Sequence, residues 1–120
     1  MRMLLNVDFP PEAFNQAVKD GTVGQKIRRI LEDSKPEAVY FTEQNGRRGA
    51  ILIVDLAEPS QVPAWCEPWF LAFNANVSIR LAMTPEDLEK AGGNAPLIAP
   101  IISGKFLAEP QFTPMKRMDL

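Results

Sequence analysis

The chain has 120 residues, 46% hydrophobic and 23% charged, with 13 basic and 15 acidic residues and a formal net charge of -2. This composition predicts a compact globular protein, and the interspersed charges, without a basic block, argue against nucleic-acid binding. Because the chain contains no histidine, Ser-His-Asp and Cys-His catalysis, imidazole proton transfer and His-ligated zinc or haem are excluded.

The cysteine content and the lengths of the apolar stretches exclude further kinds of site and of protein. Cys66 is the only cysteine, so it cannot close an intramolecular disulfide or build a thiolate metal site, and we expect a small buried side chain. We expect no cofactor and no metal, and acid-base chemistry would fall to Asp, Glu, Tyr or Lys. No apolar stretch approaches about 20 residues, and the first nine residues do not resemble a signal peptide. A soluble, cytoplasmic protein without a membrane partner is expected.

The apolar residues among the first 36 follow the spacing of a strand and then the spacing of a helix. "MRMLLNVDF" alternates apolar and polar side chains, which predicts a strand. Residues 12–34 carry apolar side chains at helical intervals, interrupted by "DGTVG" at 20–24. We therefore expect one broken helix or two short ones, with Thr22 as a possible N-cap of the second and Pro36 beyond its end.

The clearest local signal is a hairpin. "EAVYFTE" and "RRGAILIVDL" are rich in β-branched and aromatic residues and flank Asn45-Gly46, a pair that suits a type I′ turn between two strands.

A second helix is predicted from Ser60, as its cap, to about Asn74. Pro68 inside it removes a backbone donor, so this helix should kink or restart there. "NVSIRLAM" at 76–83 then alternates like a strand. "TPEDLEKAG" predicts a short helix with Thr84 as N-cap and Gly92 at its end.

The resulting order is strand, helix, strand, strand, helix, strand, which is the α+β ferredoxin-like split βαβ arrangement with a four-stranded antiparallel sheet. Its helices cover one sheet face, toward which Met3, Leu5, Val7, Val77, Ile79 and Leu81 should point. The opposite face would expose Leu4 and Tyr40. We expect a second subunit to cover it, sheet to sheet, in a homodimer.

The segments "PEAVYFTEQNGRRG", "PSQVPAWCEPWFLAFNA" and "MTPEDLEKAG" resemble, in order and spacing, the small bacterial proteins of the dimeric α/β-barrel superfamily. Muconolactone isomerase is a better understood protein of that architecture. The resemblance covers roughly residues 1–92. It implies two ferredoxin-like units packed sheet to sheet with small-molecule sites near the sheet and helix edges, and it carries over no catalytic motif.

Polar residues on the predicted open face form the first candidate site. The strand patterns place Asn6 and Asp8 beside Ser78 and Arg80 of the neighbouring strand. Arg80 would bind an anionic group and Asp8, desolvated by a partner subunit, would act as a base, while Tyr40 would donate a hydrogen bond. The alternative is an interface ion pair between Asp8 and Arg80.

The stretch "PAWCEPWF" forms the second candidate site. Trp65 and Trp69 share a helix face and would bind an apolar ligand, and Glu67 beside the indole rings would serve as a general acid. The alternative is that these aromatic side chains fill the core. Nothing in the sequence supplies a base for Cys66 as a nucleophile.

Two parts are therefore expected, a ferredoxin-like domain over 1–94 and a Pro-rich apolar arm over 95–120 that packs on the domain or the partner subunit. The functional hypothesis is a small-molecule-binding protein with isomerase-like proton transfer on a small apolar or aromatic anionic metabolite. The alternatives are ligand binding without turnover and a purely structural homodimer.

Overall fold

The structure is a computed structural model that describes residues 1–92. The arm predicted over 95–120 lies outside the described residues. Met1–Ala82 and the segment that begins at Met83 are separate units, and each is described by itself. The strands are β1 (Arg2–Asp8), β2 (Ala38–Gln44), β3 (Arg47–Asp55) and β4 (Asn76–Leu81), and the helices are α1 (Pro11–Lys19), α2 (Val23–Ser34), α3 (Val62–Phe73) and α4 (Pro85–Gly92).

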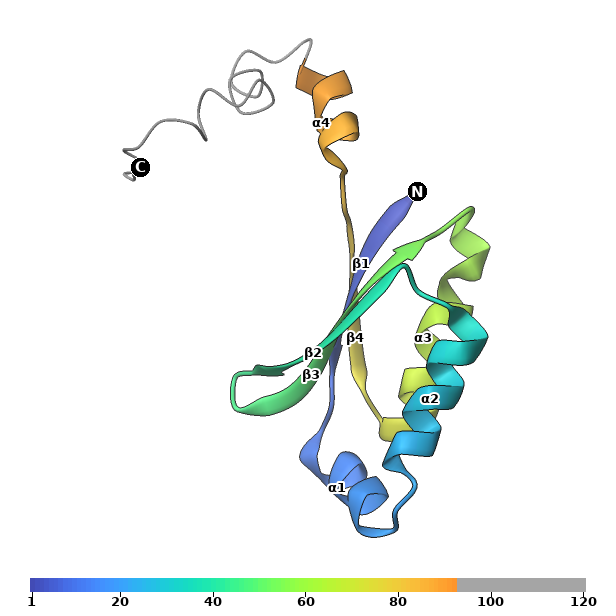
Figure 1. Ribbon diagram of the computed structural model, residues 1–120, viewed down its shortest axis with the longest axis vertical. Helices are drawn as coiled ribbons and strands as arrows, with labels where there is room; N and C mark the ends of the chain where they lie inside the picture. The colour runs from blue at the N-terminus through green and yellow to red at the C-terminus, as the bar shows by residue number, and fades with distance from the viewer. Residues whose placement is uncertain (93–120) are drawn as a thin grey trace, which may run out of the picture. The chain divides into compact units, whose positions relative to one another are not determined.

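The four strands form one antiparallel sheet in the order β2-β3-β1-β4 (Figure 1). Together with helices between β1 and β2 and between β3 and β4, this order confirms the α+β ferredoxin-like split βαβ fold. In β1, Leu5 and Val7 are buried while Leu4 and Asn6 on the other face remain partly exposed. The predicted alternation is therefore the alternation observed.

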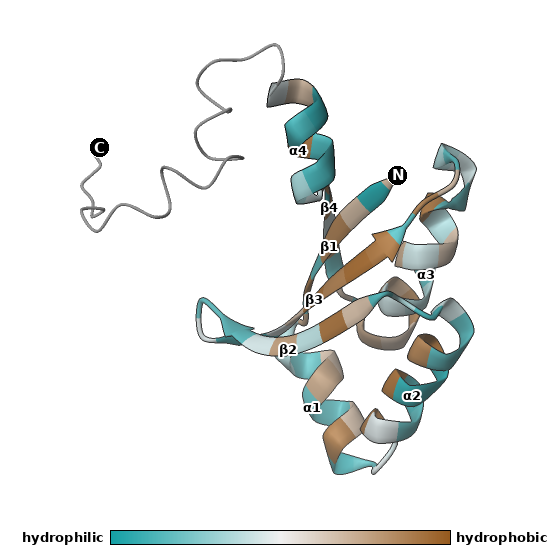
Figure 2. Cartoon of the chain, turned by 45° about the horizontal axis from the view of Figure 1, so that its top comes forward, coloured by the Kyte–Doolittle hydropathy of each residue, from teal (hydrophilic) through white to brown (hydrophobic). Residues whose placement is uncertain are grey.

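The hairpin between β2 and β3 turns at Asn45-Gly46, as predicted. Both residues have positive φ, 54° and 79°, which a type I′ turn requires at its two central positions. Figure 2 shows the apolar middle of β3 in brown and the polar turn in teal and white.

Residues 11–34 form two helices. Gly21, with φ of 80°, lies in the connection between α1 and α2. Thr22 occupies the predicted N-cap position of α2, but its hydroxyl donates to Asp20 Oδ1 at 2.6 Å and makes no cap bond. The hydrogen bonds from the Thr22 side chain and backbone lower the pKa of Asp20. The α2 helix ends at Lys35, which adopts a left-handed conformation.

The α3 helix differs from its prediction in two respects. It follows a 3-10 turn over Pro59–Gln61, and the Gln61 side chain, instead of Ser60, accepts the N–H groups of Ala57 and Glu58 at 2.7 and 3.3 Å. The helix also continues through Pro68 instead of restarting there. Ala64, whose carbonyl loses its usual i+4 donor, is exposed, so water can satisfy that carbonyl.

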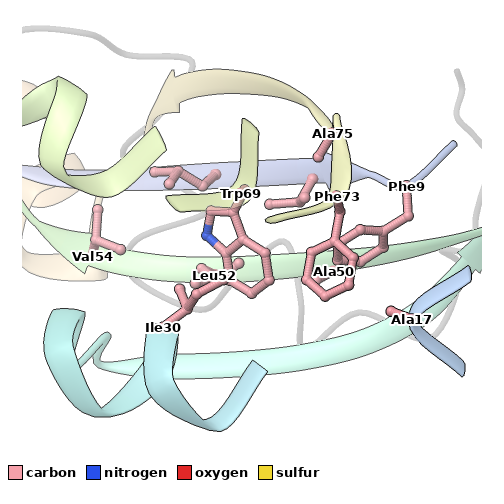
Figure 3. Close-up of a cluster of buried hydrophobic side chains, with 11 residues drawn as sticks. Phe9, Ala17, Ile30, Ala50, Leu52, Val54, Trp69, Phe73 and Ala75 are labelled. Atoms are coloured by element: carbon pink, nitrogen blue, oxygen red, sulfur yellow. The ribbon is translucent and has the colours of Figure 1, made fainter. Parts of the chain in front are cut away.

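The core lies between the helices and the sheet, and aromatic rings make up much of it. Trp69 and Phe73 of α3 are fully buried and Phe9 is 1% exposed. The ring of Phe9 meets those of Trp69 and Phe73 edge to face, at centroid distances of 5.7 and 5.2 Å. Figure 3 shows this cluster with Leu52 and Ile30 beside the indole. Core packing, the alternative weighed for the tryptophans, is thus the role of Trp69.

Helices α1, α2 and α3 lie on one side of the sheet (Figure 1). The register of the strands shows which residues lie on the sheet face that these helices leave uncovered. We call it the open face; its residues are Arg2, Leu4, Asn6, Asp8, Ala38, Tyr40, Thr42, Gln44, Arg47, Gly49, Ile51, Ile53, Asp55, Asn76, Ser78 and Arg80. The opposite, helix-covered face holds Met3, Leu5, Val7, Val77 and Ile79 as predicted, whereas Leu81 shares its register but is 68% exposed.

The second unit begins with the predicted short helix, α4. The Thr84 hydroxyl accepts the N–H of Asp87, and the Asp87 carboxylate accepts the N–H of Thr84, both at 3.1 Å. This reciprocal pair satisfies two donors of the first turn. No helix among residues 1–92 has the length and apolar character needed to span a bilayer.

Candidate functional site: a cavity between the helices and the hairpin

The residues predicted from sequence as a site lie in three places. Tyr40, Asn6 and Ser78 form one row across the open face, because Tyr40 and Asn6 both face Ile51 and Asn6 faces Ser78. Trp69 is in the core and Trp65 is partly buried on α3. Glu67 is exposed. The structure therefore does not gather these residues into one site.

The partner of Asp8 differs from the one predicted, whereas Asn6 lies opposite Ser78 as expected. Arg80 lies opposite Leu4, whereas Asp8 lies opposite Asn76. The Asp8 carboxylate instead accepts two hydrogen bonds from Arg47, at 3.1 and 2.9 Å. The predicted pairing of Asp8 with Arg80 is wrong because the register places Arg80 four residues away from Asp8 along β1.

A second polar contact crosses the open face. Asn6 Nδ2 donates to Gln44 Oε1 at 2.7 Å. To reach Asn6, the Gln44 side chain lies over Gly49, where a Cβ would overlap it. One donor of Asn6 and both carboxylate oxygens of Asp8 are thus bound to neighbouring strands, while Arg80 has no hydrogen bond or ion pair within residues 1–92.

A concave site lies on the other side of the sheet. A cavity of about 860 Å³ opens between α1, the beginning of α2 and the β2–β3 hairpin. Its apolar wall consists of Phe9, Phe14, Val23, Ile27 and Phe41. Phe9 and Phe14 belong to the aromatic core cluster and meet edge to face at 5.0 Å, so this wall is rigidly supported. We call this site the hairpin cavity.

One cation is held at the wall of the hairpin cavity. The Arg48 guanidinium carbon lies 4.5 Å from the centroid of the Phe14 ring, and its Nη1 donates to Asn15 Oδ1 at 2.8 Å. Stacking and one hydrogen bond fix the orientation of the guanidinium. Since arginine has five N–H donors, most of them remain available to an anionic group in the cavity.

The hairpin cavity also has a carboxylate, that of Glu43. Glu43 lies directly opposite Arg48 in the β2–β3 ladder, and its Oε2 accepts the N–H of Gly46 at the turn. Arg47, the other charged lining residue, is bound to Asp8. Arg48 is therefore the lining cation that has no ion pair within residues 1–92.

Cys66 does not have the environment of a nucleophile. It is 6% exposed, and burial, followed by the neighbouring Glu67 carboxylate, raises the pKa of its thiol. Reactive thiols have the opposite shift. Among the residues described, no cluster of three or more acidic or cysteine side chains is arranged to hold a metal ion.

Sequence reasoning missed the hairpin cavity, because its residues come from four separated segments. A usable signal was present in the hairpin. Counting back from the Asn45-Gly46 turn pairs Glu43 with Arg48 and Phe41 with Ala50, and the apolar Ala50 identifies that face as the buried one. Because alternate residues of a strand share a face, this pairing would have placed Arg48 and Phe41 on the helix-covered face of the sheet.

Comparison with known proteins adds no assignment. No protein-family model matches the chain, and none of the curated proteins matches it. The functional argument therefore rests on the geometry of the described residues.

Proposed function

We propose that the protein binds a small molecule that joins an aromatic or apolar body to one anionic group, and that the hairpin cavity is the binding site. The observation that carries this proposal is a fixed guanidinium, that of Arg48, in a cavity whose apolar wall includes three phenylalanines. The volume is within the usual range of ligand pockets, about 300–1,000 Å³.

The lining suggests how such a ligand would be held. Phe14 is partly buried and packs against the core, whereas Phe41 is 50% exposed on the hairpin. An aromatic body placed between them would cover the exposed ring and gain apolar contact on both faces. Its anionic group would then accept hydrogen bonds from Arg48, which are stronger than those between neutral groups.

Binding without turnover has the stronger support. Isomerase-like proton transfer would require a carboxylate that is free to reach the ligand, and Glu43, the acidic residue that lines the hairpin cavity, accepts the N–H of Gly46 at the turn. Asp8 is occupied by Arg47, and Glu67 is exposed on α3. The two carboxylates assigned to catalysis from the sequence therefore have no part in this proposal.

The proposal includes a homodimer joined through the open faces. Leu4, Ala38, Tyr40, Ile51 and Ile53 form an apolar band on that face, and Tyr40 is 65% exposed. Ion pairs flank the band, Asp8 with Arg47 at one end and Arg2 with Glu37 at the other. An apolar centre with a polar rim is the pattern of protein interfaces. In such a dimer, Ser78 and Arg80 would be covered too.

The binding proposal is tested by calorimetry with naphthalene-2-carboxylate and its uncharged carboxamide. The carboxylate is expected to bind at least about tenfold more tightly, the amount that a charged hydrogen bond supplies. Arg48→Gln should abolish this preference, while Arg28→Gln, on the exposed surface of α2, should preserve it. A preference that survives in Arg48→Gln would refute the assignment of the anion site.

Native mass spectrometry of the freshly purified chain tests the dimer and any retained ligand together. A dimer or a larger assembly carrying extra mass supports both parts of the proposal. Tyr40→Lys places a charge in the apolar band and should abolish association through the open face, so this variant should form smaller assemblies than the unchanged chain. If Tyr40→Lys associates as the unchanged chain does, the open face is not the interface.

A further inference from the structure

A second concave surface lies on the outer side of the helix layer, and the hairpin cavity does not include it. It is a groove of about 760 Å³ between α2 and α3. Ile30 of α2 and Trp65, Pro68 and Ala72 of α3 supply its apolar lining. We call it the helix groove.

The α3 helix is unusually apolar for a helix at the surface. Glu67 is its only charged residue in twelve. Leu71, on the rim of the helix groove, is 81% exposed, and two turns earlier the small, exposed Ala64 lies on the same rim. Together with the apolar lining of the helix groove, these two residues form a contiguous apolar surface, which is typical of sites that bind another protein.

Charges along the helix groove are segregated by sign. The end of α2 and the beginning of α3 meet at the same end of the sheet, because Asp33, Ser34, Asp55 and Gln61 all line the groove. Asp33 makes this end acidic, whereas the carboxylate of Asp55 is paired with the N-terminal amine. Lys26 and Arg29, nearer the beginning of α2, make the other part basic. Neither Lys26 nor Asp33 has an ion pair within residues 1–92.

We propose that the helix groove binds a second copy of this chain. A two-fold axis that lies in the interface and crosses the helices at right angles would place α2 antiparallel to α2 of the other copy, and likewise α3 to α3. Centred near Ile30 and Pro68, the axis exchanges Lys26 with Asp33 and Leu71 with Ala64. Each basic end meets an acidic end, and each exposed leucine meets an alanine.

The same symmetry explains why the partner is a second copy. A two-fold interface requires a surface that complements itself, and the helix groove does so in both charge and size. One unfavourable contact follows: Arg29 lies close to the axis, so its two copies approach each other. Arg29→Gln should therefore strengthen the association, which an unrelated partner with acidic groups would not explain.

This interface does not depend on the ligand or on the open-face dimer, because it lies on the opposite side of the sheet (Figure 1). Both surfaces can be occupied at once, so the unchanged chain is expected to form assemblies larger than a dimer. The Tyr40→Lys variant, blocked at the open face, isolates the helix groove.

Sedimentation velocity of the full-length Tyr40→Lys chain over a concentration series provides the test. Lys26→Asp or Asp33→Lys alone brings like charges together and should weaken dimerisation about tenfold or more, whereas the double exchange restores it. Leu71→Gln should also weaken it, while Val18→Gln, at an exposed apolar residue of α1, should not. Circular dichroism confirms that each variant is folded.

Three results would overturn the inference. The first is a Tyr40→Lys chain that stays monomeric at every concentration. The second is a double exchange that is as weak as either single variant. The third is a Leu71→Gln chain that dimerises as well as Val18→Gln. Failure of naphthalene-2-carboxylate binding would leave all three measurements unaffected, so the two proposals are separable.

Discussion

Arg47 of β3 binds Asp8 of β1 through both carboxylate oxygens, with Nε to Oδ1 at 3.1 Å and Nη2 to Oδ2 at 2.9 Å. Asp8 faces Gly49 in the ladder, so Arg47 reaches it from two residues away along β3. Both side chains are about one-third exposed, 38% and 30%. This pair ties the hairpin to the end of β1 that leads into the aromatic cluster.

A double-mutant cycle with Asp8→Asn and Arg47→Gln should give a coupling free energy of about 0.5–1 kcal/mol. Two hydrogen bonds between the same side chains favour the upper part of the range measured for surface ion pairs. Solvent exposure keeps the coupling free energy within that range. Urea unfolding of the four proteins supplies the number. As a control, Asp55→Asn removes the contact with the N-terminal amine, 67% and 60% exposed, and should change the free energy of unfolding little.

Two glycine substitutions distinguish the energetic effect of the left-handed backbone at the turn from that of side-chain packing. A Cβ at Gly46 or at Gly24 would meet no atom within 4 Å, but only Gly46 has a positive φ, 79°. Gly46→Ala should lower the free energy of unfolding by about 1–2 kcal/mol because of the left-handed backbone. Gly24→Ala, in the first turn of α2, should raise it by about 0.5 kcal/mol.

Thermal and urea unfolding measure both variants. A neutral Gly46→Ala would mean that the hairpin can adopt another turn at no cost. That result would weaken the register argument that places Arg48 at the hairpin cavity.

Gly49 is required because the Gln44 side chain occupies the space that its Cβ would take. Gly49→Ala should displace Gln44 and break its hydrogen bond with Asn6, at a cost of about 1 kcal/mol. In a Gln44→Ala background the same substitution should cost much less, since the obstructing side chain is absent. Equal costs in the two backgrounds, measured by urea unfolding, would show that Gln44 is not the obstacle.

Much of the fold could be predicted because its signals are local. Alternation over residues 1–9, the Asn45-Gly46 pair and the cap formed by Thr84 with Asp87 each depend on a few neighbouring residues. Of the two outcomes predicted at Pro68, a kink or a restart, the structure excludes the restart. Proline disfavours a helix interior in general, but here the carbonyl that it leaves unpaired belongs to exposed Ala64.

The site was harder to predict because it depends on register between strands far apart in the chain. Arg47 and Arg48 are adjacent in sequence, yet one binds Asp8 across the open face and the other stacks on Phe14 beside the hairpin cavity. Choosing between Arg47 and Arg80 as the partner of Asp8 requires the pairing of β1 with both of its neighbours. Periodicity gives the face of a residue and not its level along the strand.

The buried thiol of Cys66 should make stability depend on pH in the alkaline range. Burial and the Glu67 carboxylate raise its pKa above the ordinary value of 9.0, so the unfolded chain loses this proton first. Above about pH 9 the unfolded state therefore binds fewer protons, and the free energy of unfolding falls as pH rises through the raised pKa. Below pH 9 this contribution is fully present.

Cys66→Ala tests that dependence, because it removes the titrating group but not the lysines and the tyrosine. Urea unfolding at pH 7 should show the variant less stable than the unchanged chain, since a buried side chain is shortened. Between pH 9 and pH 10.5 the difference should shrink, because only the unchanged chain loses the thiol contribution. A difference that is constant over this range would contradict the raised pKa, and Cys66→Ser would then report whether polarity at this site matters at all.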